Sequence, residues 1–421
     1  MKKIISALYV ISTCCLSGCQ IGATAVDSNT PDTRFNLATG ITSLYPFAGG
    51  SGLFVETPLM QANDGNLYGT STSGGGYGSG TIFKISLTGT KTLIYNFGQN
   101  QTDAAYPRAG LIQLSDNYLY GTSSAGGNPN ACESNGCGAI YKISLTGQNE
   151  QIIYAFESRS TGNTPLSGVT YNDHDGFLYG TASAGGINCA ESGSQIGCGI
   201  VFKIKPDGSD YAVVHQFAGG NNDGQQPEGN LIVATNGVLY GITSNGGTNN
   251  VGTIYKIESN GNEAIVYSFE SGSDGAYPGA GLIQASDGNL YGTTNYGGYA
   301  NQGVVYKFDL NNQQETVIKT FMGGNDGANP NCTLVQANNG LLYGTTIQGG
   351  AAATGTHNSG TIFAIALDGT YYQVLALFNQ INGSFPYAGL VQASNNLFYG
   401  TSSQGSTYFE GNVFVFNPTN N

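Results

Sequence analysis

A Tyr-Gly-Thr motif repeats along this chain, and its spacing limits the folds that the chain can adopt. Seven copies occur, 51 to 61 residues apart, and only the fourth departs, with Ile242 in place of Thr. Their tyrosines are Tyr68, Tyr120, Tyr179, Tyr240, Tyr291, Tyr343 and Tyr399. A period near 50 residues with glycine-rich turns is typical of β-propeller blades, and no stretch shows a sustained 3.6-residue apolar period.

Each repeat predicts four short antiparallel strands. In the fifth repeat we expect strands over residues 280–286, 289–295, 303–309 and 315–321, separated by turn-forming Gly, Asn and Asp residues. Four strands per unit is the plan of a propeller blade. The sequence therefore predicts an all-β, seven-bladed propeller.

The turn between the first two strands has the same chemistry in every repeat. Each copy has Asp or Asn followed by Gly or Asn, as in Asp287-Gly288, which predicts a two-residue hairpin turn with positive φ. Turn chemistry accounts for these acids, so we assign them no catalytic role. The Gly after each Tyr indicates a close backbone approach, which we expect between neighbouring blades near the axis, with the Tyr packed between blades.

The two ends of the chain predict how the ring closes. The seventh repeat has three strands, over residues 388–394, 397–403 and 411–416, and then the chain stops. Residues 41–47 (ITSLYPF) resemble a fourth strand and precede the first repeat. We therefore expect the N-terminal strand to complete the last blade, which removes two exposed sheet edges.

The N-terminus is typical of a bacterial lipoprotein. Lys2 and Lys3 precede a short apolar segment, and residues 16–19 (Leu-Ser-Gly-Cys) resemble the lipobox. The resemblance implies a signal peptide over residues 1–18, lipidation of Cys19, a flexible tether over 19–40 and a propeller over 41–421. Gln20 is compatible with the outer membrane. An ordinary secretory signal with a chance cysteine is the alternative.

Cysteines in two neighbouring repeats predict disulfide bonds. An exported compartment permits disulfides, so we pair Cys132 with Cys137 and Cys189 with Cys198. A zinc site is the rival interpretation, but the sequence has no CxxC and its three histidines lie far from these loops. Cys332 has no partner in this scheme, and we expect it to be a small buried thiol.

The blade pattern DGxLYGTTxxGG, followed by GxIYKI and YxF, resembles the choice-of-anchor tandem repeat (GloVer-type) family over about residues 41–416. The family carries varied cell-surface anchors, a role that the lipobox fills here. It carries no agreed activity, so the resemblance adds no catalytic residue.

The loops between blades offer candidate ligand-binding residues. An acid or amide stands four residues before a proline at Asp103, Asp223, Asp274, Asp326 and Asn382. Near the channel mouth they would bind a cation or sugar hydroxyls, with Tyr106, Tyr277 and Phe385 as stacking surfaces. The other interpretation is that they cap turns. The long loops of repeats 2, 3 and 6 form a second candidate surface.

The composition excludes one class of partner. The formal net charge is −13 and the pI is near 4.4, so no basic footprint for nucleic acid is present. We expect a monomeric, lipid-anchored binding module of the cell envelope, with a protein or glycan partner and no metal or other cofactor assigned. A propeller hydrolase or lyase acting on glycans is one alternative, and a purely structural envelope protein is another. Asymmetric acids in the central cleft would favour the enzyme.

Overall fold

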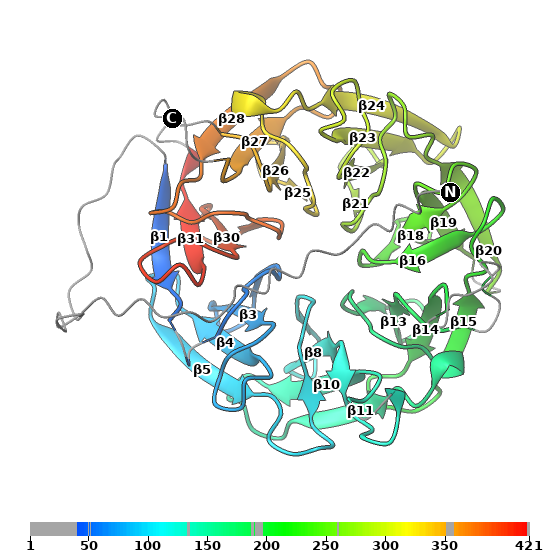
Figure 1. Cartoon of the computed structure of the whole chain (residues 1–421), viewed down its shortest axis with the longest axis vertical. Coiled ribbons are helices and arrows are strands. Elements are labelled where there is room, and N and C mark those ends of the chain that lie inside the picture. Colours follow the sequence, from blue (N-terminus) through cyan, green and yellow to red (C-terminus); the bar gives the residue numbers. More distant parts are fainter. Residues whose placement is uncertain are drawn as a thin grey trace, which may run out of the picture. The chain divides into compact units, whose positions relative to one another are not determined.

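The computed structural model describes residues 40–418, apart from 49, 51, 133–134, 187–188, 190–196, 259–260 and 351–357. The described residues form one compact unit, in which seven sheets are arranged as a ring (Figure 1). This confirms the seven-bladed propeller. The predicted signal peptide, Cys19 and nearly all of the tether lie outside the described residues. No described helix is long and apolar enough to cross a membrane.

The blades follow one another along the chain. Blade 1 contains β2 (Met60–Gln61), β3 (Leu67–Ser71), β4 (Thr81–Ile85) and β5 (Lys91–Asn96). Blade 2 contains β7 (Ile112–Gln113), β8 (Tyr118–Ser123), β10 (Ala139–Ser144) and β11 (Gln151–Ala155). Blade 3 contains β12 (Thr170–Asn172), β13 (Phe177–Ala182), β14 (Ile200–Ile204) and β15 (Ala212–Gln216). Blade 4 contains β17 (Ile232–Val233), β18 (Leu239–Gly246), β19 (Thr253–Ile257) and β20 (Glu263–Ser268), with β16 (Gly224–Pro227) also paired to β18.

Blades 5 to 7 repeat the plan. Blade 5 contains β21 (Ile283–Gln284), β22 (Leu290–Thr294), β23 (Val304–Asp309) and β24 (Gln314–Thr320). Blade 6 contains β25 (Val335–Gln336), β26 (Leu342–Thr346), β27 (Thr361–Ile365) and β28 (Tyr372–Leu377). Blade 7 contains β29 (Val391–Gln392), β30 (Phe398–Ser402), β31 (Asn412–Phe416) and β1 (Ile41–Pro46). The remaining elements are β6 (Ala104–Ala105), β9 (Ala125–Gly126), η3 (Arg159–Thr161) and η4 (Gly324–Asp326).

The N-terminal strand closes the ring, as the sequence predicts. β1 pairs antiparallel with β31, from Ile41 opposite Phe416 to Pro46 opposite Asn412. Figure 1 shows the two strands side by side at the junction of the two ends of the ring. The first strand is shorter than predicted in blades 5 and 7: it covers only Ile283–Gln284 and Val391–Gln392, where residues 280–286 and 388–394 were expected.

The Tyr of each Tyr-Gly-Thr motif packs between blades, as expected. Tyr68 is fully buried in one apolar cluster with Leu119 and Tyr141 of blade 2. Its hydroxyl donates to Asp64 Oδ2 at 2.9 Å and lies 3.3 Å from the carbonyl oxygen of Leu145, also in blade 2. The turn acid therefore also positions the tyrosine, which the sequence interpretation missed.

The first turn differs in detail from the prediction. In the fifth repeat Gly288 N–H donates to Ala285 O, and Ala285 N–H donates to Asn289 O, which encloses three residues rather than two. The positive φ falls on Gly288 alone of the Asp-Gly pair (83°), so this is a type I turn followed by a left-handed residue.

The glycine after each tyrosine is required within its own blade, and the predicted contact between blades is wrong. A Cβ built on Gly344 would lie 2.6 Å from Phe363 Cζ, an aromatic carbon of the third strand of the same blade. The same ring contact, at 2.7 Å or less, occurs at Gly69, Gly121, Gly180, Gly241, Gly292, Gly344 and Gly400. The third-strand aromatic ring lies over the glycine, which leaves no room for a side chain.

We therefore expect Gly344→Ala to destabilise the protein by about 1–3 kcal/mol, the usual cost of overpacking a core. Chemical denaturation measures this. Gly272→Ala is the matched control, because a Cβ there would meet nothing within 4 Å. Equal stability of the two variants would contradict the packing argument.

Candidate functional site

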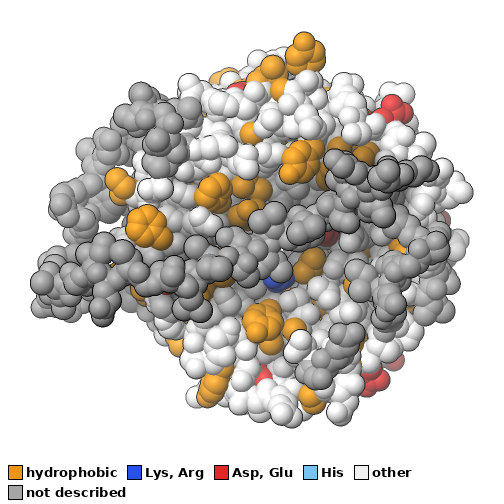
Figure 2. Space-filling model, in the orientation of Figure 1, with side chains coloured by type: hydrophobic (Ala, Val, Ile, Leu, Met, Phe, Trp, Pro, Cys, Tyr) orange, Lys and Arg blue, Asp and Glu red, His pale blue; other side chains and the backbone are white. Residues whose placement is uncertain are grey.

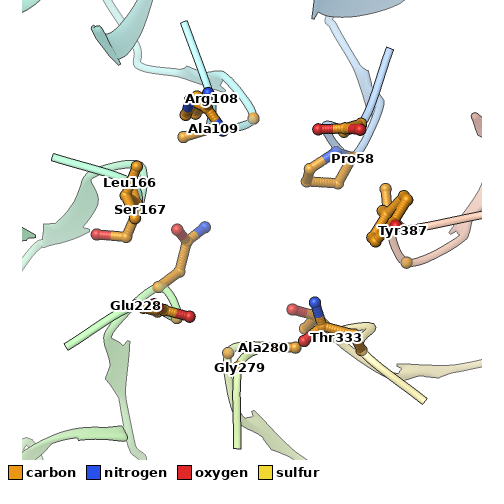
Figure 3. Close-up of a pocket in the computed structure, with 18 of the residues that line it drawn as sticks. Pro58, Arg108, Ala109, Leu166, Ser167, Glu228, Gly279, Ala280, Thr333 and Tyr387 are labelled. Carbon is orange, nitrogen blue, oxygen red and sulfur yellow. The ribbon is translucent and has the colours of Figure 1, made fainter. Parts of the chain in front are cut away.

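Loops from all seven blades meet at a cavity of about 220 Å³ on the ring axis (Figure 3). Each loop enters its blade through a proline, except in blade 1, where Val55 takes the place of the proline. In every blade the residue that follows this position lines the cavity. We call these the axial positions. They are Glu56, Arg108, Leu166, Glu228, Gly279, Asn331 and Tyr387.

The axial positions break the sevenfold repeat. They carry two carboxyl groups, a guanidinium, an amide, a phenol, an isobutyl group and a hydrogen, whereas the neighbouring proline recurs in six copies. Figure 3 shows Arg108, Glu228 and Tyr387 reaching the cavity from three different directions. Repeated residues usually serve a repeat scaffold, so a position that differs in chemistry around the ring is where a specific ligand would be recognised.

The surroundings in the cavity affect the pKa values of its two carboxyl groups differently. Burial raises the pKa of Glu228 to about 7, and a hydrogen bond with Ser244 offsets part of the rise. Burial also raises the pKa of Glu56, but the Arg108 guanidinium opposes this effect. Glu228 is therefore the carboxyl more readily protonated near neutral pH, and Glu56 has a cationic neighbour.

Several polar groups of the lining have no partner among the described residues. Asn331 Oδ1 and Thr72 Oγ1 are both buried. The amide oxygen accepts no hydrogen bond from the described residues, and the hydroxyl makes none with them. Thr72 is only 6% exposed. By contrast, Asn230 Oδ1 accepts from Gly168 N–H at 2.7 Å, which ties blades 3 and 4 together at the cavity. Buried polar groups without a partner are unusual, and a polar ligand would supply one.

A wider ring of side chains surrounds the axial positions. It consists of the residue two places before each of them, and we call these the mouth positions. They are Phe54, Tyr106, Thr164, Gln226, Tyr277, Asn329 and Phe385, all in the left-handed region with φ between 54° and 57°. Left-handed backbone is uncommon for bulky residues and typically costs about 1–3 kcal/mol, so its recurrence needs a cause.

Main-chain hydrogen bonds to two blades impose this conformation. Tyr277 N–H donates to Val251 O of the preceding blade at 2.8 Å, and Tyr277 O accepts from Asn295 N–H of its own blade at 3.2 Å. The same pair of bonds holds Phe385, from Ser359 O and Ser403 N–H. Six of the mouth positions, all but Phe54, donate a main-chain N–H to the preceding blade in this way, so the link between blades does not depend on the identity of their side chains.

Aromatic side chains at the mouth are exposed. Phe54 is 51%, Tyr106 42% and Tyr277 38% exposed, and the axial Tyr387 is 38% exposed. Figure 2 shows hydrophobic side chains around the middle of this face, with a basic side chain near its centre. Aromatic faces around a polar cavity give both stacking and hydrogen-bonding surfaces.

The predicted acid and amide residues lie elsewhere. Asp103, Asp223, Asp274, Asp326 and Asn382 are not among the residues that line the axial cavity. Asp274 Oδ2 accepts from Glu270 N–H at 2.8 Å, and Asp326 Oδ2 accepts from Met322 N–H at 2.8 Å. Asp103 and Asn382 accept in the same way from Gln99 and Asn379. The structure thus places these side chains as caps of the loops between blades.

The cysteines pair as predicted. Disulfides join Cys132 to Cys137 and Cys189 to Cys198, and Cys332 is a buried free thiol. Large parts of the long loops of repeats 3 and 6, which belong to the second candidate surface, lie outside the described residues.

The axial residues were missed in the sequence, although a signal for them was present. Aligning the repeats on their prolines shows a position that changes in chemistry around the ring, beginning Glu56, Arg108, Leu166 and Glu228. The acids and amides that recur before the same prolines form the more conspicuous pattern and hide this variable position.

Solved structures with the same fold have diverse roles. An oligogalacturonate lyase in complex with manganese matches at 12% identity with a TM-score of 0.57, over 90% of this chain and 92% of that one. The extracellular domain of a putative hybrid two-component system from B. thetaiotaomicron matches at 12% identity and a TM-score of 0.57, over 90% and 40%. A putative 6-phosphogluconolactonase from Bacteroides uniformis matches at 15% identity and a TM-score of 0.50, over 83% and 94%. At these identities the likeness shows the fold alone.

Sequence comparison identifies the repeat itself. No curated protein matches the chain in sequence. The model of the Gloeobacter/Verrucomicrobia repeat matches residues 33–191, 135–358 and 271–421, which together span every blade. The chain belongs to the Gloeobacter/Verrucomicrobia repeat family.

Proposed function

We propose that this protein is a lipid-anchored binding module of the cell envelope that holds a glycan, or a similar polyhydroxylated ligand, at the axial cavity. The observation that carries the proposal is the lack of symmetry at the axial positions. A ring built only as a scaffold has no need for Glu56, Arg108, Glu228 and Asn331 at equivalent places.

The size of the cavity limits the ligand. At about 220 Å³ it is smaller than the 300–1,000 Å³ typical of sites for drug-sized molecules. One sugar ring is of a suitable size, with the rest of a chain lying over the exposed aromatic residues of the mouth. Tyr106 and Tyr277 are exposed and offer flat faces on which a sugar ring could stack.

The polar lining suits hydroxyl groups. The Glu56 and Glu228 carboxyl groups accept hydrogen bonds from hydroxyls, and the Arg108 guanidinium donates to their oxygens. Asn331 Oδ1, which has no partner among the described residues, is a further acceptor. These hydrogen-bond donors and acceptors together distinguish the cavity from an apolar pocket.

Catalysis on the same ligand is the second candidate function. The cavity holds two carboxyl groups in different surroundings, with the pKa of Glu228 near 7 and Glu56 beside a cation, and glycan-cleaving enzymes divide the roles of acid and base between two such groups. In that case Glu228 donates the proton and Glu56 acts as base.

The anchor rests on the lipobox at residues 16–19, and Cys19 is the residue that carries the lipid in this proposal. Gln20 is compatible with placement in the outer membrane. Several acyl chains together hold a protein stably on a membrane.

A glycan array probed with the full chain tests the proposal, followed by calorimetric titration of the best ligand. We expect Arg108→Ala and Glu228→Gln to weaken binding about 10-fold or more, because hydrogen bonds to charged groups contribute about 1.5–3 kcal/mol. Glu157→Gln, at an exposed carboxylate outside the cavity, should bind as the parent does.

The same experiment separates the two candidates. Retained binding by Arg108→Ala and Glu228→Gln, with no cleavage of the glycan by the parent, would contradict the placement of the site. Cleavage of the bound glycan by the parent, lost in Glu228→Gln while binding remains, would establish the enzyme in place of the binding module.

A further inference from the structure

A second polar cluster lies away from the axis, between the outer strands of blades 3 and 4. It contains His215 on β15, Asp223 in the following loop and Glu263 on β20. Potential metal-ligating atoms of the three side chains all lie within 4.8 Å of one another. The site is separate from the axial cavity and does not depend on the function proposed there.

Two sister clusters show what is special about this one. Between blades 1 and 2, Tyr95 donates to Asp103 at 3.2 Å and Glu150 at 3.5 Å. Between blades 4 and 5, the Tyr267 hydroxyl donates to Asp274 at 2.9 Å and to Glu315 at 3.4 Å. In both, a phenol bridges two acids. His215 replaces the phenol with an imidazole, which has a nitrogen lone pair and is the commonest protein ligand for transition metals.

The spacing at His215 suits a shared ion. His215 Nε2 lies 3.3 Å from Asp223 Oδ2 and 3.8 Å from Glu263 Oε2. His215 Nε2 also lies 3.4 Å from Asp223 Oδ1, so the imidazole is within hydrogen-bonding reach of both Asp223 oxygens. Two ligands about 2.1 Å from a tetrahedral zinc ion would lie roughly 3.4 Å apart. The two carboxylates also balance the charge of a divalent cation.

Neighbouring groups hold two of the three side chains, Asp223 and His215, in place. Asp223 accepts from Ala218 N–H and Gly224 N–H, both at 2.7 Å, and the His215 ring packs edge-on against Phe217 at 4.7 Å. Glu263 Oε1 and the buried Tyr255 hydroxyl have no hydrogen-bond partner among the described residues, and the equivalent atoms of Glu150 and Glu315 in the sister clusters are the same in this respect. What sets this cluster apart is the imidazole, which is oriented together with Asp223 by groups outside the cluster, as metal ligands usually are.

We propose that His215, Asp223 and Glu263 bind one divalent transition-metal ion, of which Zn²⁺ is the best fit, and that this ion ties blade 3 to blade 4. One imidazole and two carboxylates make three protein ligands, so water completes the coordination. The side chains are 21%, 14% and 9% exposed, which leaves a route for the ion to enter.

The test uses the full chain freed of metal with EDTA and then titrated with Zn²⁺. We expect one ion per chain and a rise in Tm of about 3 °C at saturation, because the ion binds the folded state. Co²⁺ should give visible absorption bands at the same stoichiometry.

The sister clusters supply the matched variant. His215→Tyr recreates the arrangement found at Tyr95 and Tyr267, so it should fold with an unchanged Tm in EDTA and lose the response to Zn²⁺. Glu263→Gln should weaken the response, and His174→Ala should leave it intact, since the exposed His174 side chain pairs with Asp173, which is not part of the cluster. No Tm response in the parent, or a response kept by His215→Tyr, would overturn the proposal in favour of a simple ion pair.

Discussion

Replacing Phe47 with alanine is expected to lower the free energy of unfolding by about 3–5 kcal/mol, the usual cost of removing a buried aromatic ring. Phe47 is fully buried just after β1, and its ring meets Phe83 of blade 1 at a centroid distance of 5.1 Å. Its N–H donates to Gly411 O of blade 7 at 3.0 Å. The residue therefore links the last blade to the first, and its loss weakens the closure of the ring.

Urea denaturation of the purified protein measures the effect. Thr42→Ala on the same strand is the control, because Thr42 is exposed and its removal leaves the β1–β31 pairing in place. A whole domain typically has 5–15 kcal/mol of stability, so the Phe47 variant loses a large share. A chain that lacked residues 1–47 and yet melted at the parental temperature would contradict the closure argument.

Glu315→Gln is expected to stabilise the protein at pH 8 and to flatten its loss of stability between pH 5 and 8. Burial, followed by the nearby Asp274, raises the pKa of Glu315 to about 8, while the hydrogen bond from Tyr267 opposes the rise. The buried Tyr306 hydroxyl faces the same carboxyl group. At neutral pH the folded protein therefore holds this carboxyl group protonated.

The sign follows from proton linkage. The carboxyl has an ordinary pKa near 4.5 when unfolded, so between pH 4.5 and 8 the folded state binds the extra proton. The stabilising contribution is complete below pH 4.5 and is lost as the pH rises through about 8. Allowing for solvent screening, we expect about 1–2 kcal/mol for Glu315.

Melting curves at half-unit pH steps test this. Glu150→Gln should behave in the same way, with its transition near pH 7, because burial and Asp103 raise the pKa of Glu150 to about that value. The exposed Glu157→Gln control should follow the parental profile. A parental protein whose Tm rises from pH 5 to 8, with no change in Glu315→Gln, would show that these carboxyl groups are ionised in the fold.

The repetitive part of this architecture was readable from the sequence. The Tyr-Gly-Thr spacing predicted the number of blades, and the missing fourth strand after Phe416 predicted the role of Ile41–Pro46. Both predictions depend on periodicity, which one sequence displays in full. Local chemistry was also sufficient for the disulfides, since each pair lies within a single loop.

Contacts that depend on three dimensions were not readable in the same way. A glycine is needed at position 344 because the ring of Phe363 lies over it. The two residues are 19 positions apart, and only the pairing of their strands brings them together. The axial cavity was hidden because Glu56 and Glu228 are 172 positions apart and belong to blades 1 and 4. Only closure of the ring brings them to one cavity.

The mouth positions have an evolutionary consequence. Their left-handed backbone is imposed by main-chain bonds, and it already accepts Phe, Tyr, Thr, Gln and Asn. A mutation at any one of them therefore changes what the surface displays while the scaffold beneath stays the same. Duplicated copies of such a gene can diverge in recognition one side chain at a time, as antibody loops do, without having to refine a new fold.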